Sequence, residues 1–95
     1  MRSKFLLGLL YCSFALSFAQ EGKVTNHIYE GNEDVQKEAY IKAEKSYRKA
    51  LSLAPEKATA LYNLGNTHFL DKKYDEASQR FFQTQKFASS KEDKH

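Results

Sequence analysis

The sequence has very little cysteine or proline. Its 95 residues include one cysteine, one proline and no tryptophan. The cysteine is Cys12, so the remainder of the chain can form neither a disulfide nor a cysteine-ligated metal site. We interpret Cys12 as an apolar filler rather than a lipidated cysteine, because the bulky Tyr11 precedes it. The proline is Pro55, which lacks an amide hydrogen and disfavours helix in the residue before it, so it ends a helix expected over residues 40–54.

The chain also lacks a strong excess of positive or negative charge. The chain has 15 Lys and Arg against 12 Asp and Glu, and Arg2 and Lys4 precede the segment that we expect to remain after processing. The near balance gives no electrostatic basis for binding nucleic acid or an anionic membrane. A hydrophobic content of 41% with 28% charged residues is typical of a folded chain rather than a disordered one.

Residues 1–19 have the features of a secretory signal peptide. Arg2 and Lys4 give a positive start, residues 5–18 are apolar, and small residues stand three positions and one position before Gln20. The apolar run is shorter than the roughly 20 residues that cross a membrane. We expect cleavage before Gln20 and a periplasmic or envelope-associated protein, and an uncleaved anchor is the alternative. Residues 20–26 are expected to form a polar lead-in.

Two copies of one pattern follow, 34 residues apart. A period near 34, with small residues where helices must touch, is typical of tetratricopeptide (TPR) repeats. We predict an all-α, antiparallel helix-turn-helix TPR array of about two repeats in a right-handed α-solenoid, as a fragment of a longer array. Repeat 1 covers 27–57 and repeat 2 covers 58–91, while 92–95 is either a polar tail or the start of a missing third repeat. The matching residues are Gly31-Asn32 with Gly65-Asn66, Tyr40 with Tyr74, Ala43 with Ala77, and Tyr47 with Phe81.

The four expected helices cover about 27–37, 40–54, 58–70 and 75–88. Thr25 or Asn26 is expected to cap the first, and Asp75 the last. Nothing in the sequence between the first two helices forces a break, so we expect a turn there by analogy with the second copy. The residues assigned to structural packing between helices are Gly31, Ala43, Tyr47, Leu61, Leu64, Gly65, Ala77 and Phe81.

The chain resembles a particular family of exported TPR proteins, the BatC type of the Bacteroides aerotolerance operons. The stretches that carry this resemblance are the leader ending in FAQ, YEGN at 29–32, AEKSYRKALSL at 43–53 and ALYNLGNTHFLDKKYDEA at 60–77. The resemblance implies a role in envelope stress or oxygen tolerance, beside membrane proteins with von Willebrand A domains. Members of the family continue into further repeats.

Stacked repeats place the first helix of each pair on a concave face. Amides can pair there with the backbone of a bound peptide, and aromatic rings can cover its side chains. The alternative is that the same residues form only local bonds or pack on a missing neighbour. We predict a partner-binding groove formed by Ile28, Tyr29, Asn32, Tyr62, Asn63, Asn66 and Phe69, with Val35, Gln36 and Leu70 beside them.

The sequence gives little support for an enzyme. His27, His68 and His95 are scattered without a second ligand at helical spacing, so we expect no metal, no cofactor and no small-molecule substrate. Ile28 stands where a chaperone-tail clamp would need a lysine, which argues against that mode of binding. We expect a protein-interaction scaffold, with a structural spacer as the alternative. Phe82 and Phe87 should be partly uncovered, so we expect self-association through the C-terminal end.

Overall fold

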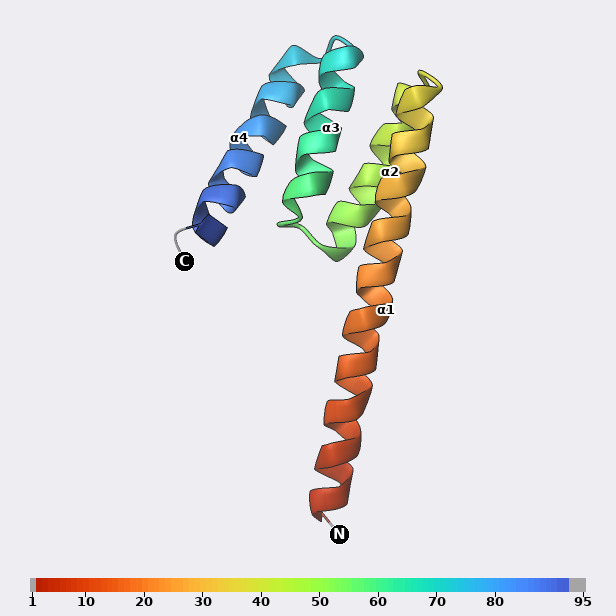
Figure 1. Cartoon of the computed structure of the whole chain (residues 1–95), viewed down its shortest axis with the longest axis vertical. Coiled ribbons are helices and arrows are strands. Elements are labelled where there is room, and N and C mark those ends of the chain that lie inside the picture. Colours follow the sequence, from red (N-terminus) through yellow and green to blue (C-terminus); the bar gives the residue numbers. More distant parts are fainter. Residues whose placement is uncertain (1, 93–95) are drawn as a thin grey trace.

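A computed structural model describes residues 2–92 of the chain, and the side chains of residues 19–88. Its four helices are α1 (Arg2–Gln36), α2 (Tyr40–Leu53), α3 (Ala58–Leu70) and α4 (Tyr74–Glu92). Helices α1 and α2 form one antiparallel pair and α3 and α4 form another, as Figure 1 shows. The fold is therefore an all-α array of two helix-turn-helix units, as predicted.

The two tight turns have the same backbone geometry. Glu38 and Lys72 occupy the left-handed region with φ of 59° and 63°. In each turn the residue after the left-handed one donates a hydrogen bond to the carbonyl five residues earlier. These bonds run from the Ala39 amide to the Asp34 carbonyl and from the Lys73 amide to the His68 carbonyl, both at 2.8 Å. This is the Schellman pattern of helix termination. The turn expected by analogy in the first copy is thus confirmed.

The start of α4 differs by one residue from the expected one. The helix begins at Tyr74, so Asp75 lies inside the first turn instead of capping it. A carboxylate in the first turn still faces the positive end of the helix dipole and stabilises it. Expected and observed bounds agree for α3, and for α2 they differ only at Ala54.

Helix α1 is much longer than the sequence predicts. It runs without a break from Arg2 through the segment expected to be a polar lead-in, so the predicted start near His27 is wrong. Figure 1 shows its N-terminal part extending well beyond the other three helices. Polar residues at 20–26 do not end a helix unless a breaker stands among them, and Val24 in that segment is only 5% exposed. In the described part of the chain, no helix combines the length and apolar character that membrane crossing needs.

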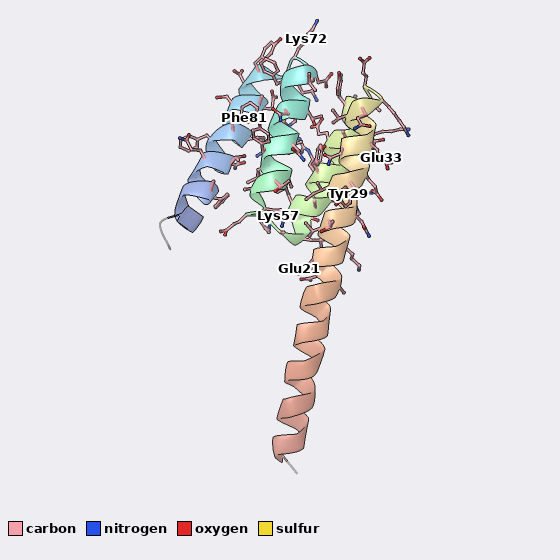
Figure 2. The ribbon with its side chains drawn as sticks, viewed as in Figure 1. Glu21, Tyr29, Glu33, Lys57, Lys72 and Phe81 are labelled. Atoms are coloured by element: carbon pink, nitrogen blue, oxygen red, sulfur yellow. The ribbon has the colours of Figure 1, made fainter. Side chains whose placement is uncertain are left out.

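At the centre of each helix pair, an aromatic side chain packs against a glycine of the other helix. A Cβ built on Gly31 would lie 2.5 Å from a ring carbon of Tyr47, and one built on Gly65 would lie 2.6 Å from a ring carbon of Phe81. Real Cβ atoms do not lie at such distances, so a methyl group at either position requires the facing ring to move. Figure 2 shows Phe81 between α3 and α4. Ala43 and Ala77, which are 0% and 2% exposed, are the small residues on the opposite helices.

A second set of contacts joins the two pairs. Ala60 and Leu64 of α3 belong to the same buried cluster as Ile28, Tyr47 and Ala50 of the first pair. Helix α3 therefore has two buried sides, one toward α4 and one toward repeat 1. This arrangement makes the core continuous across the repeat boundary, as in other stacked repeats.

We predict that the two ring-facing glycines differ in their tolerance of alanine. Gly31→Ala should lower the free energy of unfolding by about 1–3 kcal/mol, because the Tyr47 ring is buried and cannot retreat. Gly65→Ala should be close to neutral, because the half-buried Phe81 ring can shift outward while the helix gains about 1 kcal/mol of propensity. Urea unfolding of both variants measures the difference.

Gly22→Ala is the matched control, since a Cβ at that position meets no atom within 4 Å. It should not destabilise the protein. Equal losses for Gly31→Ala and Gly65→Ala would show that the two rings are equally confined, contrary to this packing scheme.

Candidate functional site

The predicted groove corresponds to a shallow hollow where α1 faces α3. Its volume is about 220 Å³. Side chains that carry amides or hydroxyls supply most of its wall, and only one aliphatic residue is among them. The lining residues are Asn32, Val35, Gln36, Tyr47, Asn63, Asn66 and Thr67.

The Asn32 amide is the centre of a hydrogen-bond network in this hollow. Its Oδ1 accepts a bond from the Tyr47 hydroxyl at 2.6 Å and another from Asn63 Nδ2 at 3.1 Å. Burial raises the pKa of the Tyr47 phenol to about 12, against the opposing effect of a hydrogen bond with Thr67. The phenol therefore stays protonated and donates at any physiological pH. These bonds fix the Asn32 and Asn63 side chains across the repeat boundary.

Other polar groups of the hollow remain available. Among the described residues, the Gln36 and Asn66 side chains form no hydrogen bond. Tyr29 lies three residues before Asn32 and seven before Gln36, on the same stripe of α1, and is 63% exposed. Figure 2 shows Tyr29 and Glu33 along this part of α1. The available groups are amides with an aromatic ring beside them.

Three of the predicted groove residues lie elsewhere. Ile28 is 8% exposed and belongs to the core, so the expectation that it faces the groove is wrong. Tyr62 packs on the Phe81 ring at 5.9 Å and Phe69 packs on Tyr74 at 5.3 Å, so both lean toward α4. Asn32, Asn63 and Asn66 line the α1–α3 hollow, whereas Tyr29 is not among its lining residues.

The sequence did not predict two of the residues that line the groove. Thr67 is 1% exposed and lines the hollow, and its hydroxyl donates to the Asn63 carbonyl at 2.8 Å. Tyr47 was assigned to packing alone, yet its hydroxyl reaches the same hollow. A buried tyrosine normally finds a partner for its hydroxyl, so the change from Tyr47 to Phe81 between the copies is the signal that points to this role.

A cluster of charged groups lies away from the groove, where α2 meets the α3–α4 turn. Glu44 is bound by Arg48, four residues later on α2, at 2.7 Å and by Lys73 at 3.2 Å. Burial acts to raise the pKa of Glu44, but the hydrogen bonds from Lys73 and Arg48 outweigh it and the net shift is downward. The Lys73 contact joins the two repeats and could not be read from helical spacing.

His68 is buried beside this cluster, with 1% of its surface exposed. Neither ring nitrogen has a hydrogen-bond partner among the described residues. Burial lowers the pKa of His68, and the Glu44 carboxylate only partly opposes this effect. The cations that also disfavour its protonation are Arg80, Lys73 and Arg48.

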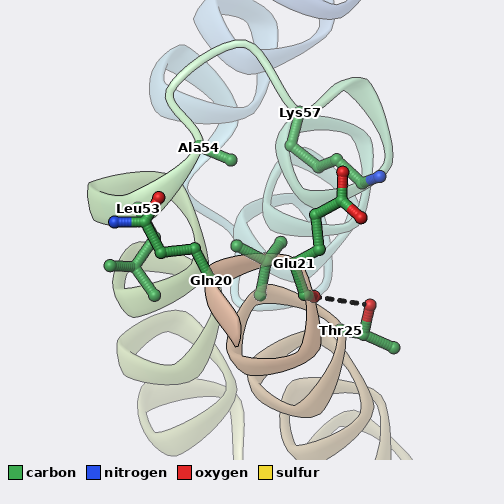
Figure 3. A pocket seen from close by; sticks show the side chains of 7 residues that line it. Gln20, Glu21, Thr25, Leu53, Ala54 and Lys57 are labelled. Carbon is green, nitrogen blue, oxygen red and sulfur yellow. Dashed lines mark hydrogen bonds between the residues drawn. The ribbon is translucent and has the colours of Figure 1, made fainter. Parts of the chain in front are cut away.

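A larger hollow of about 470 Å³ opens between the middle of α1 and the α2–α3 loop, shown in Figure 3. The Thr25 hydroxyl donates to the Glu21 backbone carbonyl at 3.0 Å, so it has no proton left to donate to a ligand. Glu21 and Lys57 are the charged residues in its lining. In the part of the chain that the structure describes, no three His, Cys, Asp or Glu side chains gather in a way that would hold a metal ion.

In a comparison with known protein families, residues 31–72 match the family model described as TPR repeat. This segment is similar to TPR repeats. It covers the end of α1, all of α2 and α3, and the turn after α3, which is less than half of the chain. The match supports a TPR protein, a class that generally mediates protein–protein interaction and typically acts as a non-enzymatic scaffold. No curated protein and no solved structure matched the chain.

We predict that protonation of His68 destabilises the fold. Because the pKa of His68 is lowered in the folded state, the unfolded chain binds the proton more readily. The stability that neutral His68 provides is complete above its ordinary pKa of 6.5 and is lost as the pH falls below it toward the folded pKa. Thermal melts between pH 7 and pH 5 should therefore show a falling Tm.

His68→Leu should flatten this pH dependence, until the lowered pKa of Glu44 contributes a further loss below about its ordinary value of 4.5. His27→Leu, which replaces the half-buried histidine of α1, should leave the dependence in place. An identical pH profile for wild type and His68→Leu would contradict the assignment.

Proposed function

We propose that the chain is a protein-interaction scaffold that binds an extended segment of a partner protein in the α1–α3 groove. The observation that carries this proposal is the row of amides along the groove. Two of them, Asn32 and Asn63, are fixed by the bonds to Tyr47 and to each other. Two more, Gln36 and Asn66, line the same hollow and have no bond among the described residues.

An extended peptide has the complementary chemistry. Its backbone offers alternating N–H and C=O groups, and a carboxamide can bind either. Fixed side chains lose little rotamer freedom when they bind, which lowers the cost of association. The exposed Tyr29 ring lies on the same stripe of α1 as Asn32 and Gln36, and from there it can cover an apolar side chain of the peptide.

We further propose that this scaffold acts in a bacterial envelope after export and removal of residues 1–19. The proposal rests on the leader and on the resemblance to the exported BatC type. The same resemblance points to membrane proteins with von Willebrand A domains as partners and to a role in aerotolerance or envelope stress. The first strongly buried residue of α1 among those described is Val24, so cleavage before Gln20 would leave the described core whole.

Site-specific photocrosslinking in the native cell tests the groove. A benzophenone amino acid at Tyr29 should capture a protein partner, because the side chain stands on the groove stripe and is 63% exposed. Ile41 on α2 is the matched control, since it is 65% exposed but lies on the other helix of the pair. Mass spectrometry of the adduct, isolated from separated cell fractions, identifies the partner and the first residue of the chain, which we expect to be Gln20.

Loss of the adduct in a Gln36→Ala, Asn66→Ala double variant would localise binding to the amide row. Equal capture from Tyr29 and Ile41 would contradict a groove-specific partner. If no adduct forms at either position, the structural-spacer alternative is favoured. A peptide that begins at Met1 in the adduct would overturn processing while leaving the scaffold proposal in place.

A further inference from the structure

The outer surface of α2 carries positive charge and no exposed carboxylate. The exposed side chains of this helix are cations, two aliphatic residues and a serine, and we call the surface that they form the α2 outer face. Its residues are Ile41, Lys42, Lys45, Arg48, Lys49, Ser52 and Leu53. The near balance of charge along the whole chain therefore does not hold for this helix.

Most cations of the α2 outer face have no partner of opposite charge. The carboxylate of α2 itself, Glu44, has only 14% of its side chain exposed and is already bound by Arg48 and Lys73. The three lysines of the face take part in none of the ion pairs found among the described residues. The next carboxylates along the chain, Glu38 and Glu56, lie in the turns before and after the helix. The positive charge of the face is thus free to attract an anionic partner.

The α2 outer face is an exposed strip rather than a cavity. Ile41 and Leu53 stand at its two ends and are 65% and 37% exposed. At 1.5 Å per residue they are about 18 Å apart along the helix axis. Between them, Lys45, Arg48 and Lys49 line none of the described hollows. Such a strip suits an extended charged surface better than a small ligand.

We propose that the α2 outer face binds the surface of a membrane that contains anionic phospholipids. A cluster of four or more Lys and Arg on an amphipathic helix is typical of proteins that bind anionic headgroups. The long lysine side chains reach the phosphates, while Ile41 and Leu53 contact the layer between the headgroups. The apolar side of α2 is buried in the core, so the contact is peripheral and mainly electrostatic.

A second copy of the chain is a poorer occupant of this face. The exposed carboxylates Glu30 and Glu33 of α1 share one stripe with Lys23 and, in the turn that follows, Lys37. The two cations cancel the two carboxylates, so this stripe offers no net negative charge to α2. Nucleic acid is also disfavoured, because neither tyrosine of α2 is exposed for stacking on bases.

Membrane contact through α2 leaves the groove accessible. No residue of the α2 outer face lines the groove, so a partner protein can bind there while α2 rests on lipid. The inference goes beyond the proposed scaffold and does not depend on it. Because lipid is the occupant, a benzophenone at Ile41 should still capture no protein, and it remains a valid control for the groove.

Vesicle binding by the full chain tests the proposal. Vesicles of phosphatidylcholine mixed with phosphatidylglycerol should bind the chain more tightly than vesicles of phosphatidylcholine alone, and added salt should reduce the difference by screening the charges. Each Lys or Arg near an anionic surface strengthens binding about fivefold. The Lys45→Gln, Lys49→Gln double variant should therefore bind the mixed vesicles roughly twentyfold more weakly. Both side chains are exposed, so the variant should keep the fold.

The matched control is a second double variant with the same net charge. Lys23→Gln, Lys37→Gln removes two exposed lysines that lie outside the α2 outer face. Its binding to the mixed vesicles should stay close to that of the wild type. With nitroxide-labelled lipid, the amide NMR signals of Lys45 and Lys49 should broaden more than that of Glu33, which localises the contact to α2.

Three results would overturn the proposal. The first is no preference for the mixed vesicles, and equal binding to both kinds would place the contact on the apolar residues 5–18. The second is an equal loss of binding in the two double variants, which would show that net charge alone sets the affinity. The third is tighter binding to polyglutamate than to the mixed vesicles, lost in Lys45→Gln, Lys49→Gln, which would make an acidic protein the occupant. Capture from Tyr29 tests the groove independently of all three.

Discussion

The contact of an aromatic ring with a helical glycine is the constraint on which the rest of the structure depends. Tyr47 on Gly31 and Phe81 on Gly65 set how closely the helices of each pair approach. Once the two helices of a pair are that close, a turn of three residues is enough to join them. Both turns have the same left-handed geometry, at Glu38 and Lys72. The small cost of a non-glycine residue in that geometry is offset by the packing on both sides of the turn.

The two copies of this contact have different surroundings among the described residues. In repeat 1 the Tyr47 hydroxyl extends past the ring contact and donates to Asn32, and α3 packs over the Tyr47 ring. In repeat 2 Phe81 has no hydroxyl and no described helix lies over it as α3 lies over Tyr47, so Phe81 is only half-buried and Tyr62 and Phe69 are exposed. The covered copy therefore holds the Asn32 and Asn63 amides in place, whereas the uncovered copy leaves aromatic rings exposed.

Much of the fold was predictable because it depends on local pattern and on a repeat that appears twice. The period located both turns, including one with no breaker in its sequence, and the small residues located the close contacts. The start of α1 was not predictable by the same means, because polar residues 20–26 lower hydrophobicity without breaking a helix. Ile28 was misplaced because a helix in a stacked array has two buried sides, and one apolar stripe does not reveal the second. The Lys73–Glu44 bridge and the Thr67 wall of the groove arise from contacts between repeats, which sequence spacing does not encode.

The central claim is that one packing unit is used twice, once covered and once uncovered. Native-state hydrogen exchange of the full chain, resolved by residue, tests it most directly, because exchange reports the local free energy of opening. We predict slower exchange in α1 and α2 around Gly31 and Tyr47 than at the matching positions around Gly65 and Phe81 in α3 and α4. Protection in α4 equal to or greater than that in α2 would contradict the account.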